Sequence, residues 1–296
     1  MDNEESMSDE RQTQEAKEPR MVRPRRSVLF MPGSNARALE KARTLGCDVV
    51  ALDLEDAVAP GAKETARAAV CAVVSAGAFA GKEVAIRINA LSSAWGAEDL
   101  KEVAKARPDA VILPKVANAD DIAEARKRIP GLDLWAMIET SSAVLNISAI
   151  AAAGVQCLVL GSNDLMKDLR ALPLPGRENL WLSMSLVVLT ARAHGIAAID
   201  GTYNAIADEA GLEAACEQGR AFGFDGKTLV HPGQIEAANR AFAPGEAEIA
   251  AALSVQAAFA RNPGASVLAL DGRMLERLHA EEAARILALA EAIQKR

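Results

Sequence analysis

Two acidic residues stand at the ends of short apolar runs, where folding alone does not explain a carboxylate. Glu139 directly follows Leu134-Trp-Ala-Met-Ile138, and Asp164 follows the run Cys157-Leu-Val-Leu160. Burial of an ionised carboxylate costs free energy unless a counter-charge meets it. Mg²⁺ is a suitable counter-charge, because it binds one or two carboxylates and keeps positions open for water or substrate. The two acids therefore predict half of a Mg²⁺ site.

Other polar residues end or follow further apolar runs of the chain. They are Asp53, Glu55, Asp56, Arg87, Asn89, Lys115 and Asp200. Several acids gathered in one basin repel one another at neutral pH unless a cation neutralises some of them. The 3 histidines of the chain lack the spacing of zinc ligands. This composition favours Mg²⁺ over zinc.

Arg87 and Lys115 are the cations of this set. The planar guanidinium of Arg87 can hold a substrate carboxylate or carbonyl oxygen, and the alternative is an ion pair with Glu139 or Asp53. A desolvated Lys115 could form a Schiff base with a carbonyl substrate. However, Pro114-Lys115 already leaves the apolar run, where a hydrated lysine is the commoner outcome. A Schiff base would also leave the acids without a purpose, so we favour the metal.

The elements that must position these residues follow a regular alternation. Apolar runs cover residues 27–31, 49–54, 84–88, 110–113, 134–138, 157–160, 196–199 and 226–230. Helical patterns between them include residues 35–45, 63–76, 97–106, 119–128, 142–153 and 211–222. Eight such units predict an α/β fold, a (β/α)8 TIM barrel with right-handed crossovers. The competing doubly wound sheet is disfavoured because Met31-Pro-Gly-Ser-Asn35 lacks the GxGxxG fingerprint.

Segments on either side flank the predicted barrel at residues 25–243. Residues 1–24 are polar and predict a disordered N-terminal tail. Arg26 directly precedes the first apolar run and could reach an anionic ligand. Residues 244–296 predict a C-terminal helical extension with a helix over 246–261, an apolar run over 266–270 and a last helix that carries Leu275 on its apolar stripe. Such an extension serves as a lid or an oligomer contact.

Composition excludes several function classes. Of the 296 residues, 50% are hydrophobic and 25% charged, as in a soluble globular protein with a sizeable core. The net charge of -7 argues against nucleic-acid and membrane-surface partners. No apolar run approaches the roughly 18 residues of a membrane span, and the first residues do not form a signal peptide. We therefore expect a cytoplasmic protein.

Several motifs, in order along residues 25–294, together carry a specific resemblance. They include Arg26-Ser-Val-Leu-Phe30, Asp53-Leu-Glu-Asp56, Arg87-Ile-Asn89, Leu113-Pro-Lys115, Met137-Ile-Glu139, Gly161-Ser-Asn-Asp164 and Leu270-Asp-Gly-Arg273. With these motifs the chain resembles the citrate lyase β-subunit-like family of the HpcH/HpaI aldolase superfamily, close to its malyl-CoA lyase and thioesterase members. The resemblance implies a TIM barrel and Mg²⁺-dependent chemistry on CoA thioesters such as citryl-CoA, malyl-CoA or citramalyl-CoA.

The resemblance also implies residue roles. Glu139 and Asp164 would bind the metal, Arg87 would hold the oxo-acid or enolate oxygen, and Asp271 would act as the acid/base. In malyl-CoA-type relatives a neighbouring subunit's C-terminal lid contributes this aspartate, which implies a homo-oligomer, a trimer or a hexamer. The implied substrate contacts are Arg87, Glu139, Ser162 and Asn163. The implied CoA contacts are Phe30, Arg37, Lys41, Val230 and His231, and the implied partners of metal-bound water and Arg87 are Asp53, Glu55 and Asp56.

Three functions remain open at this point. The first is a lyase that cleaves or forms a carbon–carbon bond in a Claisen-type reaction between a 2-oxo acid and an acetyl-CoA-type product. The second is a (3S)-malyl-CoA thioesterase that uses the same Mg²⁺ site, because segments such as Gly201-Thr-Tyr-Asn-Ala205 and Glu217-Gln-Gly-Arg220 are similar to that branch. The third is a non-catalytic CoA-binding member, which the intact set of Arg87, Glu139, Asp164 and Asp271 argues against.

Overall fold

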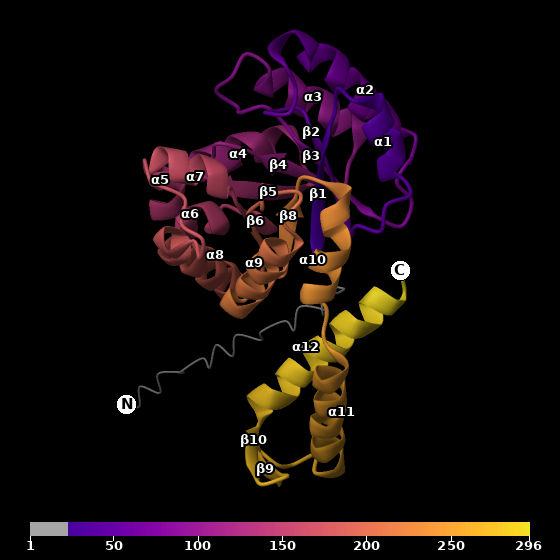
Figure 1. Cartoon of the computed structure of the whole chain (residues 1–296), viewed down its shortest axis with the longest axis vertical. Coiled ribbons are helices and arrows are strands. Elements are labelled where there is room, and N and C mark those ends of the chain that lie inside the picture. Colours follow the sequence, from indigo (N-terminus) through magenta and orange to yellow (C-terminus); the bar gives the residue numbers. More distant parts are fainter. Residues whose placement is uncertain (1–22) are drawn as a thin grey trace, which may run out of the picture.

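Eight parallel strands close into a barrel in the order of the sequence (Figure 1). The computed structural model describes residues 23–296. The strands are β1 (Ser27–Pro32), β2 (Val49–Asp53), β3 (Glu83–Arg87), β4 (Ala110–Leu113), β5 (Asp133–Ile138), β6 (Cys157–Leu160), β7 (Ala197–Asp200) and β8 (Gly226–Leu229). The register of β8 against β1, with Val28 opposite Thr228, completes the closure. The predicted (β/α)8 barrel is confirmed.

Helices surround the barrel and connect its strands. They are α1 (Ala36–Ala42), α2 (Lys63–Ser75), α3 (Gly96–Ala106), α4 (Ala119–Arg128), α5 (Ser141–Leu145), α6 (Ile147–Ala152), α7 (Ser162–Asp168), α8 (Trp181–His194), α9 (Glu209–Phe222) and α10 (Ile235–Ala241), with short 3-10 turns η1 (Pro60–Ala62), η2 (Glu178–Leu180) and η3 (Pro232–Gln234). The single helix predicted over 142–153 is two helices. The backbone of Asn146 leaves the helical region there, and its side chain donates a hydrogen bond to the carbonyl oxygen of Ala117.

Apolar side chains fill two separate cores because each barrel strand is buried on both faces. Inside the barrel, small residues such as Ala51 and Ala85 leave room for Trp135, and all three are fully buried. The guanidinium of Arg25 lies 4.7 Å from the centre of the Trp135 ring. Arg25 closes the N-terminal end of the barrel, where it binds both carboxylate oxygens of Glu83 at 2.8 and 2.6 Å. The larger core lies between the strands and the helices.

Arg26 lies at the N-terminal end of β1, away from the C-terminal strand ends where barrel active sites form. Its guanidinium binds both carboxylate oxygens of Asp48 at 2.8 and 2.9 Å. The prediction that Arg26 could reach an anionic ligand of the site is therefore wrong.

The predicted tail over 1–24 lies outside the described residues except for Arg23 and Pro24, of which Pro24 is buried.

The C-terminal segment forms an arm of α11 (Glu246–Arg261), β9 (Val267–Leu270), β10 (Arg273–Glu276) and α12 (Arg277–Gln294). Figure 1 shows the arm apart from the barrel, with the β9–β10 hairpin at its far end. Leu275, predicted on the last helix, instead lies in β10 and pairs with Leu268. Arg296 attaches the end of the arm to the N-terminal end of the barrel, where it donates to the carbonyl oxygens of Asp48 and Gly81. Within residues 23–296, no helix has the length and apolar character of a membrane span.

Two polar residues predicted in the basin point into the helix layer instead. Asp200, at the end of β7, is fully buried beside α9, where a Cβ atom on Gly219 would lie 2.8 Å from its Oδ2. Lys227 of β8 and Arg177, before η2, both bind its carboxylate at 2.8 Å. Asn89 is held by Asp99 of α3, which accepts both its backbone and side-chain N–H groups. Both residues are therefore structural.

Replacement of Asp200 by Asn should destabilise the barrel, because it leaves buried Lys227 and Arg177 facing each other without a counter-charge. We expect the free energy of unfolding in urea at pH 7 to fall by about 3–5 kcal/mol. The matched control is Arg285→Met, which removes an exposed ion pair with Glu282 and should cost about 0–1 kcal/mol. Equal losses in the two variants would contradict the structural role.

The pH dependence gives a second readout for the same variant. Burial alone would raise the pKa of Asp200, but the charges of Lys227 and Arg177 outweigh it and lower the pKa below the ordinary value of 3.8. A depressed pKa gives stability that is present above the unfolded-state pKa and lost as the pH falls through the folded-state pKa. The difference in the free energy of unfolding between wild type and Asp200→Asn should therefore stay constant from pH 7 down to about pH 3.8. It should become smaller only below that pH.

Candidate active site at the C-terminal end of the barrel

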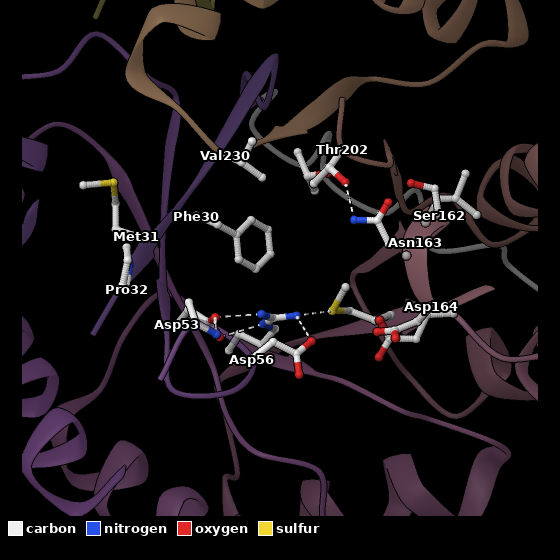
Figure 2. A pocket seen from close by; sticks show the side chains of 17 residues that line it. Phe30, Met31, Pro32, Asp53, Asp56, Ser162, Asn163, Asp164, Thr202 and Val230 are labelled. Carbon is white, nitrogen blue, oxygen red and sulfur yellow. Dashed lines mark hydrogen bonds and ion pairs between the residues drawn. The ribbon is translucent and has the colours of Figure 1, made fainter. Parts of the chain in front are cut away.

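A cavity of about 430 Å³ opens at the C-terminal ends of the strands. Figure 2 shows Phe30 directed toward its centre, with Asp53 and Asp56 on one side and Asp164 on another. The predicted site residues that line the cavity are Phe30, Asp53, Asp56, Arg87, Glu139, Ser162, Asn163, Asp164 and Val230. The predicted residues outside its lining are Arg37, Lys41, Glu55, His231 and Asp271.

Arg87 is held on one wall of the cavity by strand register. Asp53 and Arg87 are paired positions of β2 and β3, and the guanidinium binds both carboxylate oxygens of Asp53 at 2.7 Å. Asp53 also accepts the backbone N–H groups of Glu55 and Ala57, so it serves as an anchor rather than a free ligand. Burial would lower the pKa of Arg87, but the hydrogen bond and charge of Asp53 raise it. Arg87 therefore remains a fixed cation, 5.0 Å from the Phe30 ring.

Glu55 is a buried acid beside Arg87. Its Oε2 lies 2.8 Å from Nη1 of Arg87, yet the approach is too poorly aligned for a hydrogen bond, so this oxygen has no hydrogen-bond partner among the described residues. Burial raises the pKa of Glu55 to about 8, although the charge of Arg87 opposes the shift.

Glu139 and Asp164 lie together on the other wall. Glu139 follows β5 and is 1% exposed, while Asp164 lies in the first turn of α7. A Cβ atom on Gly161 would lie 2.6 Å from Oε2 of Glu139, so only glycine fits there without moving the carboxylate. Burial raises the pKa of Glu139, while the charge and the backbone N–H of Lys115 oppose the shift. The buried acid thus needs a stronger counter-charge than it has.

Lys115 is not the hydrated loop lysine that the sequence predicted. Its backbone N–H donates to Oε1 of Glu139 at 2.6 Å, and its ammonium donates to Oδ2 of Asp164. Burial would lower the pKa of Lys115, but the carboxylates of Asp164, Glu139 and Glu55 raise it. Since a Schiff base requires the neutral amine, this environment also argues against that rival mechanism. The sequence places Lys115, which follows β4, in the same basin as the acids, but it does not predict this direct contact with Glu139 and Asp164.

The residues present fit Mg²⁺. No group of three or more His, Cys, Asp or Glu residues within 23–296 is placed to hold a metal alone, but Mg²⁺ typically takes one or two carboxylates and completes its shell with water and substrate. The acids around the cavity are Asp53, Glu55, Asp56, Glu139 and Asp164, against the cations Arg87 and Lys115. Their formal charge is −3, and one divalent cation would cancel most of it.

The predicted CoA contacts divide into two groups. Phe30 and Val230 line the cavity and give it an apolar side. Arg37 and Lys41 are exposed on α1. His231 is exposed and caps η3, where its Nδ1 accepts the N–H of Gly233 at 3.1 Å. Of the predicted CoA contacts, only Phe30 and Val230 therefore line the cavity.

Asp271 lies in the turn between β9 and β10, with a left-handed backbone φ of 50°. Because Arg296 attaches the arm to the N-terminal end of the barrel, the hairpin stands apart from the cavity of its own chain (Figure 1). Asp271 could therefore act only on the cavity of another copy. That role stays a prediction.

Sequence reasoning missed several residues that line the cavity. They are Met31, Pro32, Ala57, Met137, Leu160, Gly161, Thr202 and Thr228. Met137 could have been found from the strand period, because it stands two residues before Glu139 and shares its face. Thr202 accepts a hydrogen bond from Asn163 (Figure 2). Asn163 also accepts one from the side chain of Asn204. This contact joins the loop after β7 to α7.

Comparison with known proteins agrees with this architecture. The chain is 45% identical over 273 residues to a (3S)-malyl-CoA thioesterase of Cereibacter sphaeroides, covering 91% of this chain and 96% of that protein. It is 33% identical to the citrate lyase subunit beta of Escherichia coli, covering 92% and 95%. The crystal structure of CitE from Mycobacterium tuberculosis in complex with magnesium, acetoacetate and coenzyme A matches with a TM-score of 0.75 and 29% identity, covering 90% and 98%.

The family predicted from the motifs is confirmed by a family model. The model of HpcH/HpaI aldolase/citrate lyase matches residues 26–232, which include the whole barrel from β1 to β8. The chain therefore belongs to the HpcH/HpaI aldolase/citrate lyase family.

Proposed function

We propose that this protein is a Mg²⁺-dependent enzyme that acts on the CoA thioester of a short 2-hydroxy acid, of which malyl-CoA is the best candidate. The observation that carries the proposal is that Arg87 and the Glu139–Asp164 pair line one cavity. An anionic oxo acid needs both a fixed cation and a metal beside it. The relatives that the chain matches act on malyl-CoA or bind magnesium, acetoacetate and coenzyme A.

Each residue has a part in this site. Glu139 and Asp164 would hold Mg²⁺, which supplies positive charge that polarises a substrate oxygen. Arg87 would stabilise the negative charge that collects on the oxo-acid oxygen during the reaction, with Asp53 fixing its orientation. The wall of Ser162 and Asn163 would contact the substrate. Asp271 of a neighbouring copy would move a proton at the carbon next to the thioester.

The CoA moiety would enter over Phe30 and Val230, whose side chains form the apolar side of the cavity. Arg37 and Lys41 on α1 and His231 before η3 offer exposed polar groups for its phosphates. The positive charges of Arg37 and Lys41 would offset locally the net charge of -7 of the whole chain. The arm over 244–296 would assemble a homo-oligomer, and we favour a cytoplasmic trimer over a hexamer.

Two reactions use these groups. The motif resemblance favours cleavage of the carbon–carbon bond, which would release glyoxylate and acetyl-CoA from malyl-CoA. The chain is 45% identical to the (3S)-malyl-CoA thioesterase and 33% identical to the citrate lyase subunit beta. This difference in identity favours attack of water on the thioester. The second reaction is therefore retained as a full alternative.

Incubation of the purified protein with (3S)-malyl-CoA and Mg²⁺ should decide between them. Glyoxylate in the product mixture would establish the lyase, and malate with free CoA would establish the thioesterase. Chromatography of the acyl-CoA species and a colour assay for glyoxylate measure both products in one sample. Turnover that persists in excess EDTA would contradict the proposed metal dependence.

Replacement of Glu139 by Gln should abolish Mg²⁺-dependent turnover while the fold stays intact. The amide keeps the shape of the side chain but removes the charge that a hard cation requires. Calorimetry should show the loss of Mg²⁺ binding, and circular dichroism should show an unchanged fold. The control is Glu281→Gln, which neutralises an exposed acid on α12. Wild-type turnover in Glu139→Gln would refute the metal assignment.

Replacement of Asp271 by Asn should spare Mg²⁺ binding and slow turnover by about 10²–10⁴, the usual contribution of a general acid or base. A mixture of this variant with Glu139→Gln, unfolded and refolded together, should regain part of the activity. Such mixed oligomers contain cavities with Glu139 from one copy and Asp271 from another. Wild-type rates in Asp271→Asn would show that this residue is only part of a turn.

A further inference from the structure

The ammonium of Lys115 lies where a cation bound by the two acids would lie. It donates to Oδ2 of Asp164 and is 3.6 Å from Oε1 of Glu139. Its next neighbour is Oε1 of Glu55, at 4.0 Å. The side chain is 33% exposed, so the ammonium sits at the open edge of the acidic group. Lys115 therefore fills, in part, the charge requirement of the site.

The backbone of Lys115 makes a separate contribution. Its φ of 53° lies in the left-handed region that residues with a Cβ atom adopt rarely. In this conformation the N–H of Lys115 points at Oε1 of Glu139, at 2.6 Å. The backbone thus fixes one acid and the side chain reaches the other. The two contributions can be separated, since a side-chain replacement leaves the N–H in place.

We propose that Lys115 is an internal counter-ion of the Glu139–Asp164 pair, and that a divalent cation binds there by displacing its ammonium. The inference rests on the proposed metal site and adds that the ammonium of Lys115 occupies this site before the metal binds. An ammonium and a divalent cation on the same two carboxylates would repel each other strongly at this distance. Metal binding is therefore weakened by the free energy that removal of the ammonium costs.

Glu55 offers the displaced ammonium a second place. It is the nearest other carboxylate, and its Oε2 has no hydrogen-bond partner among the described residues despite its burial. A small rotation of the Lys115 side chain would exchange Asp164 for Glu55. Lys115 would then pair with Asp164 while the metal is absent and with Glu55 while it is bound.

Mg²⁺ binding to Lys115→Met, measured by calorimetry after treatment with EDTA and dialysis, tests the proposal. Methionine keeps the length of the side chain and removes the competing charge. We expect binding to become about ten- to hundredfold tighter than in wild type, because a hydrogen bond to a charged group typically contributes this much. The control Lys101→Met removes an exposed charge on α3 and should leave the affinity unchanged.

Two further variants separate charge from fold. Lys115→Arg keeps a cation and should bind Mg²⁺ nearly as weakly as wild type, whereas tightening equal to that of Lys115→Met would overturn the proposal. Lys115→Gly removes the ammonium, retains the backbone N–H and suits the left-handed backbone. It should also bind Mg²⁺ more tightly, so the test does not depend on the folding of Lys115→Met alone.

Thermal unfolding gives a second readout. In EDTA, Lys115→Met should unfold at a lower temperature than wild type, since Glu139 and Asp164 have lost their counter-charge. Saturating Mg²⁺ should then raise its unfolding temperature by more than it raises that of wild type, as linkage requires for a tighter ligand. A purely structural lysine would show the first effect without the second.

Failure of this inference and failure of the metal site differ in outcome. If wild type binds Mg²⁺ and Lys115→Met binds it equally or more weakly, the ammonium does not compete and the inference is wrong. If neither wild type nor Lys115→Met binds Mg²⁺, the metal site itself is wrong, and the inference falls with it.

Discussion

The ion pair between Asp53 and Arg87 joins β2 to β3 at the mouth of the barrel, and the rest of the site depends on it. Because the two residues are paired in register, the planar guanidinium meets both carboxylate oxygens without strain. The same carboxylate accepts the N–H groups of Glu55 and Ala57 and so shapes the loop after β2. One interaction therefore fixes the cation of the site and brings a second acid, Glu55, beside it.

The wall formed by Glu139 and Asp164 lacks such a complete set of partners. Among the described residues, Glu139 accepts a hydrogen bond from the backbone of Lys115, and Asp164 from its ammonium. Asp53, in contrast, accepts four N–H groups in all. A buried acid with incomplete hydrogen bonding and a pKa raised by burial is a suitable ligand for a hard cation, because the cation supplies what the protein does not. Asp53 is therefore suited to hold Arg87 in place, whereas Glu139 and Asp164 are suited to bind a metal.

The fold and part of the site could be predicted from the sequence because both depend on local patterns. Eight apolar runs define eight strands, and parallel strands place their carboxyl ends on one face, so Glu139, Asp164 and Arg87 could be expected together. Asp200 and Asn89 satisfied the same pattern but point toward α9 and α3, where Lys227, Arg177 and Asp99 bind them. Asp200 follows Ile199, whose side chain lies inside the barrel, so the alternation of β7 turns Asp200 to the outer side. Asn89 lies beyond the last residue of β3, where this alternation no longer holds.

By itself, the sequence determined the barrel, the family and the acids available for a metal, since periodicity and short motifs are properties of the chain alone. Only the tertiary structure decided which acids are already satisfied and which are not. It placed the ammonium of Lys115 between Glu139 and Asp164, and attached the arm to the end of the barrel opposite the cavity. The physical reason is that charge balance and burial depend on distances between residues far apart in sequence, such as Lys115 and Asp164, which no local pattern encodes.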